Sequence, residues 1–171
     1  MIRPRLLLAS AISSLLALFA CRGEKTLVSS ERADKILVIK SAHMLSLMSG
    51  DRALRTYKVA LGRSPVSAKT RKGDHKTPEG IYLVDAKKEH SRFYRALHIS
   101  YPNRRDQQEA LKGGWDPGGD VEIHGIQNGI GWIGSLHRRI DWTDGCIAVT
   151  DSEMDEIWSA VKVGTPVEIR P

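Results

Sequence analysis

Short runs of alternating apolar and polar residues recur along this chain, and they limit the folds open to it. Residues 35–40 read KILVIK, in which four apolar residues between lysines predict a buried strand. Residues 43–49 and 52–61 alternate on either side of Gly50-Asp51, a pair typical of a β-hairpin turn. The strands do not alternate with long helices, so the sequence predicts a mainly β domain. Further strands are predicted at residues 81–85, 95–100, 121–124 and 166–170.

One segment, residues 151–161, has clear helical periodicity. Its apolar residues recur at i, i+3, i+4 and i+7, which places them on one face of a helix. Thr150 and Glu153 have the spacing of a capping box at its start. The sequence therefore predicts one well-defined helix here, and a shorter one is expected over residues 106–112.

The first 20 residues have the pattern of a secretory signal peptide. Arg3 and Arg5 precede an apolar run that ends at Ala20 and is shorter than a membrane span of about 20 residues. Leu18, Ala20 and Cys21 resemble the cleavage site of a bacterial lipoprotein, in which Cys21 would carry the lipid. Simple cleavage nearby and an uncleaved short anchor are the alternatives.

The chain of 171 residues thus divides into a signal peptide over 1–20, a linker over 21–33 and a single domain over 34–171. We expect export to the periplasm or cell envelope, with or without an anchor at Cys21. The formal charge is +6, and without the two arginines of the leader it is 24 − 20 = +4. This modest charge suits an anionic polymer. No long basic run is interleaved with aromatic residues, so nucleic acid is not an expected partner.

Cys146 is the candidate nucleophile. If Cys21 is lipidated or removed, Cys146 has no disulfide partner in the mature protein. It follows Gly145, which permits a sharp turn whose backbone N–H groups can face a developing oxyanion. A buried inert cysteine is the alternative. No histidine pair has metal-ligand spacing and no Cys-x-x-Cys motif occurs, so the sequence predicts neither a metal nor a cofactor.

Two histidines compete for the role of general base toward Cys146. His124 ends the predicted strand 121–124, and a strand holds a side chain rigidly enough to face a thiol. His137 is nearer to Cys146 in sequence but lies in the charged stretch 136–139, which is typical of a mobile surface loop. A base must keep a fixed geometry, so His124 is favoured.

The run from His124 to Ile147 resembles the active-site signature of the YkuD-type L,D-transpeptidases. That signature is His-Gly or His-Ser, a glycine-rich spacer, and then Ser/Thr-x-Gly-Cys before an apolar residue. A second match, KGDHKTPEGIY at residues 72–82, resembles the family's Gly-Asp-x-x-Thr-Pro-x-Gly-x-Tyr segment. The resemblance covers most of residues 34–171. It implies the curved β-sandwich of YkuD domains, with one well-defined helix after the cysteine turn.

Three features depart from the family pattern. Many members carry His where this chain has Asp144, and Arg or Asn where it has Ala148. The distance from His124 to Cys146, 146 − 124 = 22 positions, is longer than in the most familiar members. These departures bear on the choice of acceptor and substrate. We expect the Asp144 side chain to point away from Cys146, because a nearby carboxylate would raise the pKa of the thiol.

The resemblance implies a cysteine acyltransferase. In such an enzyme Cys146 is the nucleophile, His124 is the general base, and the Gly125 backbone carbonyl orients the imidazole. The N–H groups of Gly145 and Cys146 would hold the oxyanion. The candidate substrate contacts are Trp132, Trp142, Thr143 and Lys76.

The expected substrates are peptidoglycan tetrapeptide stems. The stem would lose D-Ala while its acyl group passes to an amine of a second stem peptide or of a wall-linked protein. Carbapenem-type β-lactams are expected to acylate the same Cys146. The alternatives are a hydrolytic member, either an L,D-carboxypeptidase or a peptidoglycan–protein amidase, and a non-catalytic wall-binding lipoprotein.

Overall fold

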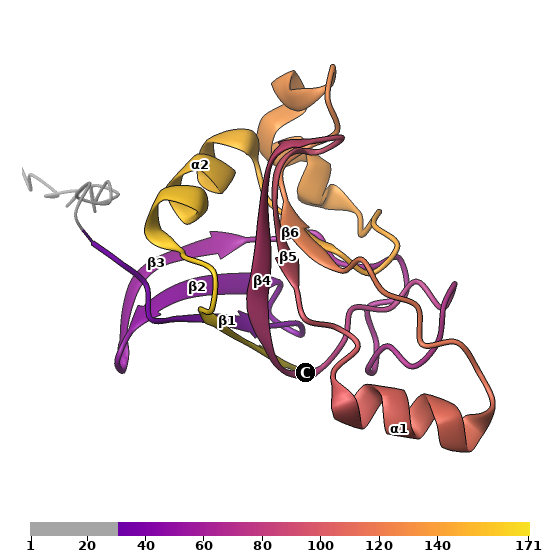
Figure 1. The fold of residues 1–171 in the computed structure, drawn as a ribbon. Coiled ribbons are helices and arrows are strands. Elements are labelled where there is room, and N and C mark those ends of the chain that lie inside the picture. The colour runs from indigo at the N-terminus through magenta and orange to yellow at the C-terminus, as the bar shows by residue number, and fades with distance from the viewer. Residues whose placement is uncertain (1–30) are drawn as a thin grey trace, which may run out of the picture.

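The computed structural model describes residues 31–171, so the predicted signal peptide, Cys21 and most of the linker lie outside the described residues. In this part of the chain, eight strands form one sheet with the order β3-β2-β1-β8-β4-β5-β6-β7. Figure 1 shows two groups of strands at a steep angle to each other, with β4 where they meet. The mainly β architecture confirms the predicted fold class.

The first half of the sheet begins with a three-stranded meander. β1 (Lys35–Ile39), β2 (Met44–Ser49) and β3 (Arg52–Lys58) pair antiparallel in succession. The last strand, β8 (Pro166–Arg170), pairs parallel with the other edge of β1. Alternate residues of β1 and β2 are fully buried, which confirms the buried strand predicted from KILVIK and the alternation predicted over β2.

β4 (Gly80–Ser91) is the longest strand and belongs to both halves of the sheet. Its first residues pair with β8, and the remainder pairs with β5 (Tyr94–Ile99). The register shifts between Val84 and Ala86, close to where one partner replaces the other. The predicted strand 81–85 covers only the first part of β4. Residues 86–90 (AKKEH) are partly or fully exposed throughout and therefore do not alternate.

The second half of the sheet ends in two short strands. β6 (Glu122–His124) pairs antiparallel with β5, and β7 (Ile147–Ala148) pairs parallel with β6. Ile123 and Ile147 lie opposite each other in the core. This parallel pair brings together the two ends of the long segment that begins at His124.

The helix α2 (Asp151–Ala160) lies in the angle between the two groups of strands in Figure 1. It is bonded to both groups. Its Glu156 accepts a 2.9 Å hydrogen bond from Tyr57 of β3, and its Asp155 accepts a 3.0 Å bond from Tyr94 of β5. Because α2 begins at Asp151 and ends at Ala160, the helix predicted over residues 151–161 is confirmed to within one residue.

Two further helical segments flank the sheet. α1 (Arg104–Gly113) is capped by Asn103 and begins two residues before the predicted start. η1 (Gly131–Arg139) is a 3-10 helix interrupted at Gly134, and it was not predicted. No helix within residues 31–171 is long and apolar enough to cross a membrane.

Candidate active site

The predicted nucleophile ends a turn that is held by one threonine. Thr143 Oγ1 donates a 2.7 Å hydrogen bond to the carbonyl of Cys146 and accepts a 3.2 Å bond from the N–H of Gly145. Thr143 is buried, so both bonds are shielded from water. The Thr-x-Gly-Cys motif thus determines the shape of the turn, and it leaves Cys146 partly exposed.

Gly145 lets this turn contact the loop that carries the second motif. Its φ of +128° is a conformation that side chains rarely adopt, and a β-carbon there would lie 2.5 Å from the carbonyl oxygen of Lys76. The Gly145 N–H was predicted to bind the oxyanion. In this structure it donates to Thr143, so it can serve an oxyanion only by leaving that hydroxyl. Its role stays a prediction.

His124 ends β6 and is buried, with a fixed ring orientation. Its Nδ1 lies 2.6 Å from the carbonyl oxygen of Gly125. A carbonyl oxygen only accepts, so Nδ1 carries the proton and Nε2 of the neutral ring keeps its lone pair. Phe93 stacks on the imidazole with ring centres 4.5 Å apart, and Trp142 packs against it edge-to-face at 5.7 Å.

Strand pairing brings Cys146 and His124 onto one face of the sheet. In the parallel pair of β6 and β7, His124 lies opposite Ala148. Two residues before Ala148, the Cys146 thiol receives a hydrogen bond from the backbone N–H of Glu122. Residues two apart on a strand share a face. Cys146 immediately precedes β7, so by the same alternation its side chain lies on the His124 side of the sheet.

Burial determines the protonation states of Cys146 and His124. It raises the pKa of the Cys146 thiol to about 11. The carboxylates of Glu122, Asp144 and Asp120 add to this increase, while the Glu122 N–H opposes it. Burial also lowers the pKa of His124, although the hydrogen bond from its Nδ1 opposes that change. At neutral pH both thiol and imidazole are uncharged, which suits proton transfer during attack rather than a preformed thiolate.

The carboxylate of Asp144 contacts the long loop between β3 and β4 rather than the thiol. It accepts a hydrogen bond from Nδ1 of His75 at 2.9 Å and another from the guanidinium of Arg63. Partial burial opposes ionisation, but these bonds hold the pKa of Asp144 below its ordinary value. Such exposed pairs add little stability. They do tie the loop to the cysteine turn.

Asp74, the acidic residue of the second motif, shapes this loop. Its buried carboxylate accepts hydrogen bonds from the Lys69 amino group and from the backbone N–H groups of Thr70, Arg71 and Lys76. Burial alone would raise its pKa, but these bonds outweigh that effect and lower the pKa to about 2. The motif therefore fixes the backbone of Lys76 where it meets the cysteine turn.

A cavity of about 420 Å³ opens beside the turn. Its lining includes Asp144 and Asp120, and the backbone carbonyl of Asp120 accepts a long 3.6 Å bond from the Cys146 thiol. Lys72 and His75 of the loop between β3 and β4 also line the cavity. The wall thus carries both cationic and acidic side chains next to the candidate nucleophile.

The four predicted substrate contacts lie in different surroundings. Trp142 lies against His124 and is partly exposed, whereas Thr143 is buried within the turn. The amino group of Lys76 bonds a serine of its own loop at 2.7 Å. Trp132, on η1, is 83% exposed. Their contact with substrate stays a prediction.

The surface-loop description of His137 was wrong. The residue is 5% exposed on η1, and its Nδ1 accepts a 3.3 Å hydrogen bond from the indole N–H of Trp142. The sequence misled because the flanking Leu136 and Arg139 are exposed while His137 turns inward. Phe93 was missed altogether. It lies in the β4–β5 turn, and no sequence pattern marks its contact with His124.

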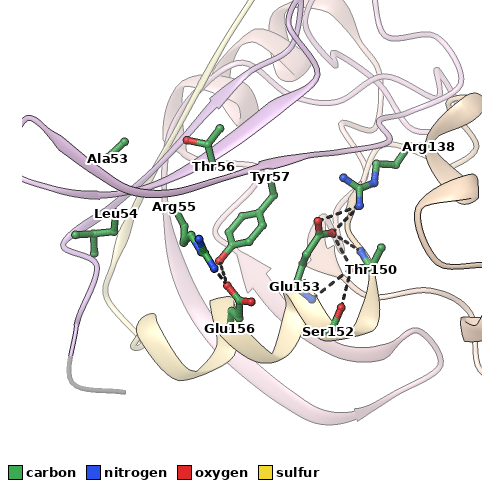
Figure 2. A pocket seen from close by; sticks show the side chains of 10 residues that line it. All are labelled: Ala53, Leu54, Arg55, Thr56, Tyr57, Arg138, Thr150, Ser152, Glu153 and Glu156. Carbon is green, nitrogen blue, oxygen red and sulfur yellow. Dashed lines mark hydrogen bonds and ion pairs between the residues drawn. The ribbon is translucent and has the colours of Figure 1, made fainter. Parts of the chain in front are cut away.

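A second cavity, of about 550 Å³, lies between β3 and the start of α2 (Figure 2). On its wall Arg138 donates hydrogen bonds to both carboxylate oxygens of Glu153, at 2.9 and 3.0 Å. Glu153 also accepts from the backbone N–H of Thr150 at the helix start. This network anchors η1 to α2. Within residues 31–171, no three His, Cys, Asp or Glu side chains are placed to hold a metal ion.

The sequence model of the YkuD family, described as the L,D-transpeptidase catalytic domain, matches residues 33–169. The chain belongs to the YkuD family. This membership confirms the family predicted from the two motifs.

Similar proteins include YafK of Escherichia coli (strain K12), whose name describes a candidate L,D-transpeptidase. It is 32% identical over 110 residues, which are 63% of this chain and 37% of YafK, so the YkuD chain spans about a third of that relative. The helical cell shape determining protein Pgp2 from Campylobacter jejuni matches with a TM-score of 0.60 at 23% identity, over 79% of this chain and 46% of Pgp2. LdtMt1 in complex with imipenem matches with a TM-score of 0.51 at 19% identity, over 79% and 57%. The two structures show the shared fold.

Proposed function

We propose that this YkuD protein is an exported L,D-transpeptidase that acts on peptidoglycan stem peptides through Cys146. One arrangement carries the proposal. The Gly125 carbonyl holds the proton on Nδ1 of His124, and the imidazole shares a sheet face with Cys146. Nε2 is thus left to receive the thiol proton, as general-base activation of a nucleophile requires.

In the acylation step, His124 takes the proton from Cys146 as the sulfur attacks the carbonyl carbon of the third residue of a tetrapeptide stem. The tetrahedral intermediate collapses with cleavage of the C–N bond to the terminal D-Ala. The imidazolium of His124 returns its proton to the departing amine. A thioester on Cys146 and free D-Ala are the products.

In the second step, an amine attacks the thioester. His124 removes a proton from that amine, the C–S bond breaks, and the thiol of Cys146 is restored as the new amide forms. The acceptor amine belongs to a second stem peptide or to a wall-linked protein. Neither step requires a metal or a cofactor.

The cysteine turn would stabilise both tetrahedral intermediates. The N–H groups of Gly145 and Cys146 would bind the oxyanion, with the Gly145 N–H exchanging its bond to Thr143 for one to the substrate. The mixed charges of the 420 Å³ cavity suit stem peptides, which carry both carboxylates and amines. Trp132, Trp142, Thr143 and Lys76 remain the proposed substrate contacts.

Two further features follow from the proposal. Carbapenem-type β-lactams would acylate Cys146, in keeping with the imipenem complex of LdtMt1. The leader over residues 1–20 would direct the protein to the periplasm or envelope, where peptidoglycan is found, with Cys21 as a candidate lipid anchor.

The deciding experiment is mass spectrometry of the products after incubating purified protein with disaccharide-tetrapeptide. Cross-linked dimers that have lost D-Ala are the expected result. Tripeptide monomers alone would instead identify a hydrolase of the L,D-carboxypeptidase type. Unchanged tetrapeptide, from protein whose Cys146 still reacts with iodoacetamide, would contradict this donor, and release of wall-linked protein would then be measured. Cys146→Ala is the matched control in each case.

A further inference from the structure

A buried histidine outside the proposed steps is bonded to the wall of the His124 site. His137 Nδ1 accepts a 3.3 Å hydrogen bond from the indole N–H of Trp142. The two rings meet edge-to-face with centres 6.3 Å apart and an angle of 82° between their planes. Trp142 is therefore fixed both by packing and by a directional bond.

Trp142 forms one wall of the space around the His124 imidazole. It meets that ring at 5.7 Å with a 64° angle, while Phe93 stacks on the ring at 4.5 Å with a 29° angle. The bond from Nδ1 to the Gly125 carbonyl restrains only one edge of the ring. The aromatic walls must limit its remaining freedom to tilt and must keep water away.

We propose that His137 is a positioning residue, which holds Trp142 against His124 so that the imidazole keeps its orientation toward Cys146. The inference rests on the proposed function, in which His124 is the general base. His137 contacts neither the thiol nor the substrate in this scheme. It acts only through Trp142.

The bond to Trp142 requires a neutral His137. Burial, assisted by the charges of Arg138 and His124 and opposed by that of Glu153, lowers the pKa of His137 to about 4. Nδ1 therefore keeps its lone pair at neutral pH, and the ring proton lies on Nε2. Nε2 is buried and has no hydrogen-bond partner within residues 31–171. An apolar side chain would avoid this unpaired N–H, but it would leave the Trp142 indole without its acceptor.

The backbone that carries His137 is also anchored. The next residue, Arg138, is bonded to both carboxylate oxygens of Glu153 on α2, as Figure 2 shows. Glu153 in turn completes the capping box with Thr150. Because α2 is packed into the core, His137 is presented to Trp142 from a rigid support.

The test compares His137→Leu, Trp142→Phe and the double variant. His137→Leu removes the acceptor, and Trp142→Phe removes the indole N–H while keeping an aromatic ring. His90→Leu, on an exposed position of β4, and Trp158→Phe, on α2, are the matched controls. His137→Gln, whose side-chain oxygen can accept from the indole, tests rescue.

The first readout is the pKa of His124, which is measured by NMR titration of its imidazole protons. We expect it to rise toward 6.5 in both single variants, because a looser Trp142 admits water to the ring. The rate of Cys146 acylation should fall by about tenfold in both variants, and KM should be unchanged in His137→Leu, since a small misplacement of a base is costly. The double variant should resemble the single variants, because both break the same bond. His137→Gln should restore most of the rate.

An unchanged His124 titration in folded His137→Leu, or fully additive losses in the double variant, would overturn the proposal. If His137→Leu does not fold, Trp142→Phe and His137→Gln give the same comparison. The titration needs no substrate turnover. A shifted His124 pKa in a protein without transpeptidase activity would therefore refute the proposed function while supporting the role of His137.

Discussion

The carbonyl oxygen of Lys76 occupies the space beside Gly145 that a side chain would need, 2.5 Å from where its β-carbon would lie. The two residues belong to the two separate motifs that mark this family in the sequence. Their contact gives a physical reason for the pairing of the motifs. One supplies the cysteine turn, and the other supplies the backbone against which that turn packs.

Gly145→Ala should therefore destabilise the domain and suppress acylation of Cys146. The new methyl group must displace the Lys76 carbonyl, and the alanine backbone must adopt a φ of +128°. Such strain costs about 1–3 kcal/mol. Urea unfolding and iodoacetamide labelling measure the two effects. Gly164→Ala is the control, since Gly164 also has a positive φ but has open space around its Cβ position. Equal effects of the two substitutions would show that the Lys76 contact does not matter.

Thr143→Val should loosen the cysteine turn while preserving its volume. The substitution removes the bonds from Oγ1 to the Cys146 carbonyl and from the Gly145 N–H, at about 1 kcal/mol each. We expect a lower free energy of unfolding and slower acylation by a carbapenem. Thr56→Val, on the exposed face of β3, is the matched control. A loss of stability without any loss of acylation rate would mean that the turn keeps its shape without the hydroxyl.

Asp74→Asn should destabilise the loop by about 2 kcal/mol at neutral pH, because the folded-state pKa of about 2 lies below the ordinary 3.8. A lowered carboxyl pKa stabilises the fold above pH 3.8, and this contribution is lost as the pH falls toward 2. The stability difference between wild type and variant should shrink over that window, which urea unfolding at several pH values can follow. Asp51→Asn, in the exposed β2–β3 turn, is the control for the loss of a carboxylate at the surface. A constant difference down to pH 2 would contradict the role of the Asp74 carboxylate.

Cys146→Ala should abolish product formation with little change in stability, because a small side chain replaces a small one. His124→Ala should slow acylation by about 10²- to 10⁴-fold, the usual contribution of a general base. His137 variants should lose far less. The reverse ranking of the two histidines in carbapenem acylation assays would transfer the base role to His137.

The acylation rate of the wild-type protein should also depend on pH in a defined direction. His124 accepts a proton only when neutral, and burial lowers its pKa below 6.5. The acylation rate should thus stay constant through neutral pH and fall only when the pH drops below the lowered pKa of His124. Carbapenem acylation measured from pH 4 to 8 tests this, and a decline centred above 6.5 would argue against a buried neutral base.

The sequence predicted those parts of the fold that show one face to the core. The apolar run KILVIK predicted β1, alternation predicted β2, and the capping box at Thr150 predicted the start of α2. The second part of β4 was not predicted because side chains on both of its faces are exposed to water. η1 was not predicted because a 3-10 helix that is interrupted at Gly134 has no regular period of apolar residues.

The candidate residues of the site could be named from the sequence, but the walls of the site could not. Cys146, His124 and Gly125 fall at positions of the motif, and the bond from His124 to Gly125 was expected. The ring contacts of Phe93 and Trp142 could not be derived. They depend on the pairing of β5 with β6 and on the path of η1, which local sequence does not encode.

β4 supplies backbone hydrogen bonds to β8 along its first part and to β5 along its second. If either half of the sheet opened alone, one end of β4 would lose its partner strand. The backbone N–H and C=O groups at that end of β4 would then be unpaired. The two halves are therefore a single cooperative unit in unfolding. Amide hydrogen exchange in the β1–β2 hairpin and in β6, which are distant in the sheet order, should require the same global opening. The strand β6, which carries His124, is thereby protected from exchange by the stability of the whole domain.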